Sequence, residues 1–411
     1  MKERKKRDAA AEAARTHCVP EAGKAYQAGD TAARAAEQKK QKSCDSEAGK
    51  TDQTRDLASF RLRVLVETEE QFAAALSSAA ELLYIDSGYF PPERWANYAA
   101  QAHAAGQRIG LRLPHIFRTE AAGYFERYRA ELLGAGFDAL LLRSFEELGW
   151  LLESGVLREL AACTQCAGTG KAENKAVTDK AMHDDMPAGE TVPAGSLELV
   201  ADHTMYAFNK EAADCLRMIF AEEMRYGSEA ESDGRGEIVA ETTAKEDGAA
   251  LVSGGTTSAA FLPGAQKNQI VFRETLPLEL NRRELAALCR ADGHTPHELV
   301  AYGRAPMMVS AQCVRKTAKS CDRKRCIMYL RDRKGMQLPV KNNCTFCYNT
   351  ILNAQPTMLL DLPDELSTVG ADCLRLEFTT ESGTEVKEIL SGRRIFKNNA
   401  FTRGHFHRGV E

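Results

Sequence analysis

Five cysteines near the carboxyl terminus have the type and spacing of metal ligands. They are Cys313, Cys321, Cys326, Cys344 and Cys347, and they fall within 35 consecutive positions. This density is too high for ordinary core cysteines, and clustered thiolates bind either a tetrahedral zinc ion or a [4Fe-4S] cluster. Zinc sites favour two CxxC pairs, and this region has one, so we favour iron and sulfide, with zinc as the alternative.

Four of the five thiols would complete either kind of centre. We expect the ligands to be Cys313, Cys321, Cys344 and Cys347, and Cys326 to be spare, because Cys326 lies in a run of charged residues. The basic residues of this region are Arg315, Lys316, Lys319, Arg323, Lys324 and Arg325. Three roles are open for these residues. They would lower the pKa values of the thiols and offset the charge of a cluster, or they would contact RNA, or they would form a solvated surface with no further role.

A second CxxC, formed by Cys163 and Cys166, follows a predicted helix and leads into a polar stretch. A thioredoxin-like CxxC would instead begin a helix directly after a strand. We therefore predict either a minor zinc site or no function for this pair.

The elements that must position these residues alternate between short apolar runs and amphipathic segments of ten or more residues. The predicted strands are Leu62–Glu67, Leu82–Asp86, Arg108–Pro114, Ala139–Ser144, Leu197–Asp202, Leu276–Leu280 and Leu299–Gly303. The predicted helices are Glu69–Ala80, Pro92–Ala105, Thr119–Leu133, Phe145–Ser154, Lys210–Ala221 and Asn281–Cys289. This α/β pattern predicts a (β/α) barrel; a doubly wound open sheet is the alternative, although no strand is followed by GxGxxG.

In a parallel barrel the functional residues lie at the carboxyl ends of the strands. We predict that Glu279, Asp202, His203 and Arg304 are catalytic residues there. Glu279 interrupts the apolar run LPLEL, where a carboxylate would cost free energy if it were buried without a partner. Other polar residues at predicted strand ends are Asp86, His115, Arg143 and Asn281.

Composition limits the class of protein. The chain has 411 residues, of which 44% are hydrophobic and 27% charged, and this is typical of a globular protein. Its formal net charge of -4 excludes a global basic field, so that an RNA site would be a local patch. Because neither a signal peptide nor a membrane span is evident, we expect a cytoplasmic protein without a membrane partner, in which clustered cysteines bind metal.

Three regions follow from these patterns. Residues 1–56 are polar and predicted to be disordered. Residues 57–310 are the predicted barrel, with polar insertions near 167–195 and 226–267. Residues 311–411 are predicted to form a small cysteine-rich α+β region, with a hairpin around residues 332–335 and a last strand at Leu374–Thr380.

Several segments resemble the collagenase-like peptidase U-32 family, specifically the carboxyl-terminal half of its long bacterial members. They include DHTMYAFN, ELVAYGRAPMMVSAQCVRKTAKSC, LRDRKGMQLPVKNNCTFCYNTILN, LRLEFTTE and FTRGHFHRGVE. Long members begin with a further barrel segment that residues 1–54 do not resemble. The chain is therefore expected to be a shortened member, a partner subunit, or a fragment whose site a second chain completes.

The resemblance implies more than the family name does. Similar relatives are oxygen-independent hydroxylases that carry a [4Fe-4S] cluster on four cysteines and modify a tRNA uridine, an rRNA cytidine or a ubiquinone precursor. Prephenate is implicated as the oxygen donor of the RNA-modifying branch. By motif, Cys313 and Cys321 match the first cysteine pair and Cys344 and Cys347 the remainder, although some relatives place a cysteine nearer Cys326.

Three functions follow as hypotheses. An iron–sulfur hydroxylase of tRNA or rRNA is the first, and it would need an electron donor. In this reading the basic tail around Arg403, His405 and Arg408 contacts phosphate. A peptidase is the second, but the sequence has no HExxH and no GxSxG, and Asp202 with His203 is the nearest candidate pair. The third is a zinc-stabilised, non-catalytic protein that binds a partner.

Overall fold

The computed structural model describes residues 60–167, 196–229, 270–291, 295–318, 321, 323–393 and 400–409. The predicted polar tail, residues 1–56, lies outside the described residues, as do nearly all of the two predicted insertions. Within the described part, no helix is long and apolar enough to cross a membrane.

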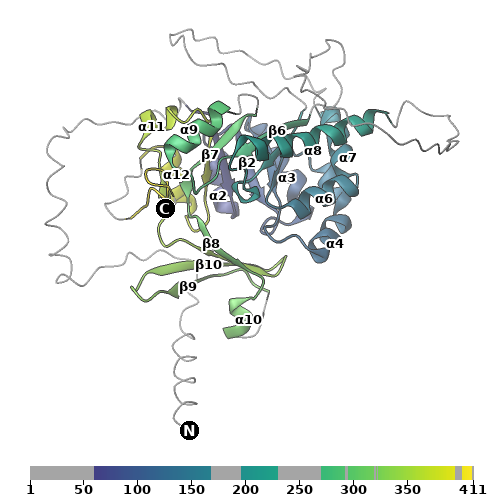
Figure 1. Ribbon diagram of the computed structural model, residues 1–411. Helices are drawn as coiled ribbons and strands as arrows, with labels where there is room; N and C mark the ends of the chain where they lie inside the picture. Colours follow the sequence, from purple (N-terminus) through teal and green to yellow (C-terminus); the bar gives the residue numbers. More distant parts are fainter. Residues whose placement is uncertain are drawn as a thin grey trace, which may run out of the picture.

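Eight parallel strands form a closed barrel (Figure 1). They are β1 (Leu62–Val66), β2 (Leu82–Asp86), β3 (Arg108–Arg112), β4 (Ala139–Leu142), β5 (Leu197–Ala201), β6 (Ile270–Thr275), β7 (His297–Gly303) and β13 (Cys373–Glu377). Each strand pairs with the next in this order, and β13 closes the barrel against β1. The predicted (β/α) barrel is confirmed.

Helices connect the strands and cover the outside of the barrel. They are α2 (Glu69–Ala75), α3 (Trp95–Ala104), α4 (Thr119–Arg127), α5 (Arg129–Gly134), α6 (Phe145–Glu153), α7 (Val156–Ala167), α8 (Lys210–Glu229), α9 (Arg282–Ala291), α11 (Pro363–Ser367) and α12 (Gly383–Leu390), with 3-10 turns η2 (Pro92–Arg94) and η3 (His203–Met205). Capping boxes begin α2, α6 and α12, where a Ser or Thr and the Gln or Glu three residues later satisfy free backbone N–H groups.

The barrel interior is charged, whereas the layer between strands and helices is apolar. Arg63, Glu198, Glu298 and Arg375 are almost completely buried inside the barrel. Arg375 Nη1 donates to Glu298 Oε1 at 2.7 Å, and Arg63 Nη1 lies 2.9 Å from Glu198 Oε1. Since alternate side chains of a strand face opposite ways, these residues share one face and the aliphatic residues between them pack against helices.

A second sheet is inserted between β7 and β13. Its four antiparallel strands, in spatial order, are β8 (Pro306–Ser310), β11 (Tyr348–Leu352), β10 (Gln337–Asn343) and β9 (Ile327–Arg331). The short helix α10 (Val314–Ala318) lies on the side of this sheet away from the barrel (Figure 1). The short strand β12 (Thr357–Met358) leads back and pairs with β7. The predicted hairpin around residues 332–335 is confirmed.

Two predicted strands were misplaced. Residues 276–280 form a turn after β6, because Pro277 cannot donate to a sheet ladder. The segment Leu374–Thr380 was assigned to a tail outside the barrel, but most of it belongs to β13, the eighth barrel strand. Its partner β1 lies more than 300 residues earlier, so local pattern could not reveal the pairing.

Candidate functional site

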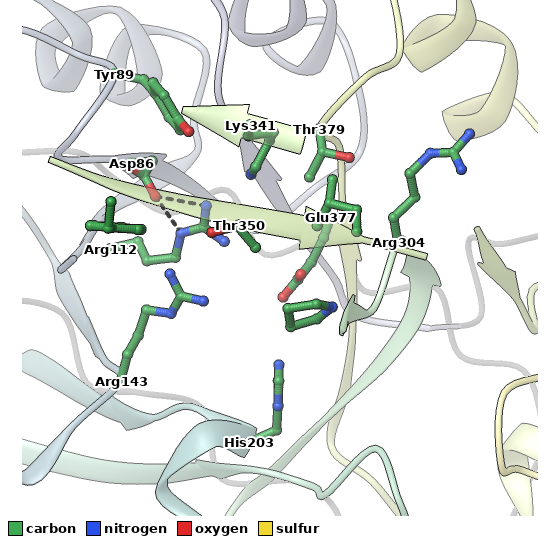
Figure 2. Close-up of a pocket in the computed structure, with 13 residues that line it drawn as sticks. Asp86, Tyr89, Arg112, Arg143, His203, Arg304, Lys341, Thr350, Glu377 and Thr379 are labelled. Carbon is green, nitrogen blue, oxygen red and sulfur yellow. Dashed lines mark hydrogen bonds and ion pairs between the residues drawn. The ribbon is translucent and has the colours of Figure 1, made fainter. Parts of the chain in front are cut away.

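A charged pocket of about 400 Å³, partly open to solvent, lies at the carboxyl ends of the barrel strands. Its lining residues are Asp86, Tyr89, Arg112, Arg143, His203, Arg304, Pro306, Lys341, Tyr348, Thr350, Leu352, Glu377 and Thr379. Figure 2 shows the side chains of Arg143, His203 and Glu377 pointing toward one another across the mouth. Four cationic side chains and two carboxylates line the pocket, and buried Glu67 and Asp202 behind the lining pair with three of these cations, so the lining is cationic while the charges of the whole site nearly balance.

The inserted sheet forms one wall of the pocket and is fixed to the barrel by hydrogen bonds. The Tyr348 hydroxyl accepts from the backbone N–H of His115 at 3.2 Å, and Thr345 Oγ1 donates to the carbonyl of Gly88 at 2.9 Å. At Gly88 an added Cβ would lie 1.9 Å from Asn343 Nδ2, so only glycine permits this close approach.

Glu67 is the buried carboxylate that joins the sheet to the barrel. Arg112 Nη2 donates to Glu67 Oε1 at 2.6 Å, and Lys341 Nζ forms an ion pair with the same oxygen. Burial opposes ionisation of Glu67, but the charges of Lys341, Arg112 and Arg325 outweigh burial and lower its pKa. Arg112 Nε also donates to Asp86 Oδ2 at 2.7 Å, so two carboxylates hold this guanidinium in place.

Asp202, His203 and Glu377 have ligand atoms within 4.8 Å of one another, the one such group among the described residues. Arg375, however, donates to Asp202 and lies 2.8 Å from Glu377 Oε1. Burial disfavours the Asp202 carboxylate, but Arg375, His203 and Arg143 reverse this effect and lower its pKa. Burial also lowers the pKa of His203, which is therefore neutral near pH 7. The arrangement suits hydrogen bonding and proton transfer better than cation binding.

The polar atoms at this end of the barrel that are buried without a hydrogen-bond partner among the described residues include His115 Nδ1 and Thr379 Oγ1. Arg143 Nε also makes no hydrogen bond, but it lies 3.4 Å from Asp202 Oδ2 in an ion pair. Burial, reinforced by the charge of Arg143, lowers the pKa of His115 to about 3, so this imidazole stays neutral. Because a buried polar group without a partner is costly, these atoms are the ones a ligand would satisfy.

The predicted catalytic residues are only partly assembled. Asp202, His203 and Arg304 lie at the barrel mouth, and the last two line the pocket. Arg304 donates to Thr380 Oγ1 at 3.0 Å and to the carbonyl of Asn353 at 3.1 Å, so it also braces two loops. Glu279 lies half-buried in the turn after β6 and does not line the pocket.

Sequence reasoning missed several charged residues of the mouth. They are Glu67, Arg112, Lys341 and Glu377. The sequence could have indicated three of them, because each is a charged residue at or next to the carboxyl end of an otherwise apolar strand. They are Glu67 in LRVLVE, Arg112 in RIGLRLP and Glu377 in LRLEF. Lys341 comes from the inserted sheet, and nothing local indicates that it reaches the barrel.

Cys344 lies in the field of the other clustered cysteines. Burial and the thiols of Cys321, Cys313 and Cys326 raise the pKa of Cys344. Cys321 and Cys347 are both exposed, so exposure does not choose between them. The contact that bears on the fourth ligand is the side chain of Asn342, which joins Cys326 to Cys344.

Asn342 links two of these cysteines. Its Oδ1 accepts from the backbone N–H of Cys326 at 2.7 Å, and its Nδ2 donates to Cys344 Sγ at 2.9 Å. Asn342 follows Lys341 on β10, and Lys341 faces the pocket. Since successive strand residues point to opposite faces, the Asn342 side chain and the Cys344 thiol that it contacts lie across β10 from the pocket.

The remaining predicted sites show less organisation. Cys163 is exposed in the last half of α7, and the side chain of Cys166 lies outside the described residues. Arg403, predicted to contact RNA, instead donates to Asp361 Oδ2 at 2.7 Å within the chain. His405 Nδ1 lies 2.9 Å from the carbonyl of Gly409, while Arg408 is exposed.

Comparison with known proteins adds no relative: no family model, no curated protein and no solved structure matches this chain. Function must therefore be argued from the geometry of the barrel mouth and the cysteine group.

Proposed function

We propose that this chain is an iron–sulfur-dependent, oxygen-independent hydroxylase that acts on a base of tRNA or rRNA. The observation that carries the proposal is the position of β10 between two sites. Lys341 on one face of β10 lines the cationic pocket, and the next residue, Asn342, contacts the backbone of Cys326 and the thiol of Cys344. A redox centre and a substrate pocket would thus share one strand.

The cysteine group supports iron and sulfide over zinc. Thiolates around one zinc ion lie about 3.8 Å apart, given Zn–S bonds of about 2.3 Å and tetrahedral geometry. No three cysteine sulfurs of the described chain come within 4.8 Å of one another. A [4Fe-4S] cluster binds each thiolate through a different iron, so it accepts more widely spaced ligands. Cys313, Cys321, Cys326 and Cys344 are the proposed set.

A bound cluster would supply one-electron chemistry, and the chain itself would tune it. Arg315 Nη1 lies 3.1 Å from Cys326 Sγ, and Asn342 donates to Cys344 Sγ. Hydrogen bonds to ligand sulfur stabilise the more negative, reduced state and raise the reduction potential.

The pocket supports an anionic oxygen donor such as the prephenate that the family resemblance implies. Arg112, Arg143 and Lys341 would hold its carboxylates beside those of Glu67, Asp86 and Asp202, and Thr379 Oγ1 would gain the partner that it lacks. In the overall exchange, a base C–H becomes C–OH while the donor's C–OH becomes C–H, so the two electrons lost by the base reduce the donor. The neutral His203 is placed to accept and return a proton.

Anaerobic purification with metal analysis and mass spectrometry of cellular RNA test the proposal. We expect a brown protein with about four iron and four sulfide per chain. Deletion of its gene should remove one hydroxylated base, and wild-type protein should restore it. A colourless protein with one zinc, together with unchanged RNA, would overturn the proposal and favour the zinc-stabilised binding protein.

The peptidase activity that the family name implies has weaker support. Its best candidate among the described residues is the group of Asp202, His203 and Glu377. Arg375 ion-pairs with both carboxylates, which disfavours a hydrolytic metal ion at this position.

A further inference from the structure

Large exposed aromatic side chains are concentrated at one side of the barrel mouth. The described chain has four of them: Phe145, Tyr206, Phe208 and Tyr329, with 56%, 60%, 37% and 54% of their surface exposed. The first three belong to the connections that follow β4 and β5, at the carboxyl end of the barrel. Tyr329 lies on β9, in the inserted sheet. Such clustering at the functional end of a barrel requires an explanation beyond chance exposure.

Tyr206 and Phe208 form a flat, ordered surface. Their ring centroids are 5.7 Å apart and their planes differ by 7°, so the rings are stacked in parallel. The residues on either side of Tyr206, Met205 and Ala207, are buried and anchor the loop. Tyr206 itself has φ 57° and ψ 44°, a left-handed conformation that costs a tyrosine free energy. The fold therefore holds Tyr206 in a backbone conformation that a tyrosine does not favour on its own, with its side chain exposed.

The pair is connected to the pocket through its own loop. His203, three residues before Tyr206, lines the pocket. Thr204 Oγ1 donates to the carbonyl of Arg143 at 2.8 Å, which fixes this loop against the end of β4. Arg143 also lines the pocket. The stacked rings thus belong to the same connection after β5 as the pocket residue His203, three and five residues further along the chain.

We propose that Tyr206 and Phe208 are a stacking platform for an unpaired RNA base beside the base that enters the pocket; this rests on the proposed function. Aromatic faces bind bases of single-stranded RNA by stacking, without reading sequence. A protein partner is less well matched, because exposed Asn209 and Lys210 follow directly and confine the apolar surface to the rings. Lys210, paired with Asp214, adds no free charge, so stacking would supply most of the contact.

The test uses the full chain and a single-stranded RNA of about twelve nucleotides that contains 2-aminopurine, whose fluorescence falls on stacking. The variant Tyr206→Asn with Phe208→Leu removes both rings, and asparagine tolerates the left-handed backbone. We expect about tenfold weaker binding, equivalent to about 1.4 kcal/mol, and loss of quenching. The exchange Tyr206→Phe with Phe208→Tyr keeps two flat rings and should bind within about twofold of wild type. Tyr329→Ala is the matched control and should change neither quantity.

Each outcome has a defined meaning once thermal unfolding shows that every variant is folded. Wild-type affinity and quenching in the ring-deleted variant would overturn the platform while leaving the proposed function intact. An equal loss in Tyr329→Ala would place the aromatic site on β9 and also overturn it. If wild-type protein does not bind the RNA, both the platform and the RNA substrate are wrong, whatever the iron content.

Discussion

The two faces of the inserted sheet differ in how their polar groups are satisfied. On the pocket face, Lys341 is buried and paired with Glu67 inside a network of ion pairs. On the opposite face, Cys326 and Cys344 are half-buried and connected through Asn342. The pocket is assembled by the charges of the chain itself, whereas the proposed cluster would supply the remaining bonds of the cysteine group.

The largest effect should come from removing a thiol that Asn342 contacts. We expect Cys344→Ser to lose nearly all bound iron and sulfide, because a [4Fe-4S] cluster needs four thiolate ligands. Cys347→Ser, three residues away and exposed, is the matched control and should keep its iron. Iron and sulfide analysis with visible absorption after anaerobic purification measures both. Equal loss in the two variants would return Cys347 to the ligand set.

The next largest effect concerns the pocket face. Glu67→Gln leaves buried Lys341 without its carboxylate and Arg112 with Asp86 alone, so we expect a loss of about 3–5 kcal/mol in the free energy of unfolding. The control Glu159→Gln removes a solvent-exposed partner of Arg129 and should cost less than about 1 kcal/mol. Urea unfolding compares the two. A small cost for Glu67→Gln would mean that the sheet does not depend on this ion pair.

Most of the fold could be predicted from the sequence, and the elements that could not be predicted were missed for physical reasons. Of the eight barrel strands, seven were predicted as strands within a few residues, although β13 was assigned to the tail instead of the barrel. The strand Ile270–Thr275 was missed because IVFRET has two adjacent charged residues, Arg273 and Glu274, and Arg273 points into the barrel beside Glu198, so that LPLEL seemed the more apolar choice. The polar interior of this barrel thus hides strands from a search for apolar runs.

The site was harder to predict than the fold, because its contacts join distant segments. Asp202, His203 and Arg304 were found from their positions at strand ends. The pairing of Glu67 with Lys341 spans 274 residues and depends on how an inserted sheet folds over the mouth. The position of Asn342 between Cys326 and Cys344 also depends on the hairpin geometry, which the spacing of the cysteines does not reveal.

A smaller, pH-dependent effect should come from His115, whose half-buried imidazole is neutral near pH 7. His115 has a pKa of about 3 in the folded chain and about 6.5 when unfolded. The unfolded state therefore binds a proton first, and stability should fall as the pH decreases from about 6.5 towards 3. His115→Gln should flatten this part of the stability curve, measured by urea unfolding at several pH values. The control His103→Gln, on the surface beside Asp138, should not flatten it.

The smallest effect should come from Glu279, the one predicted catalytic residue that lies away from the barrel mouth. Glu279 lies outside the pocket, so Glu279→Gln should leave RNA hydroxylation within about twofold of wild type. Glu377→Gln changes a carboxylate that faces His203 in the pocket and should lower hydroxylation at least tenfold, equivalent to about 1.4 kcal/mol. Mass spectrometry of RNA from complemented cells measures both variants, with iron content as the check on folding. A strong loss in Glu279→Gln alone would mean that the turn after β6 moves into the pocket when substrate binds. The predicted catalytic role of Glu279 would then be correct, although Glu279 lies outside the pocket of the free protein.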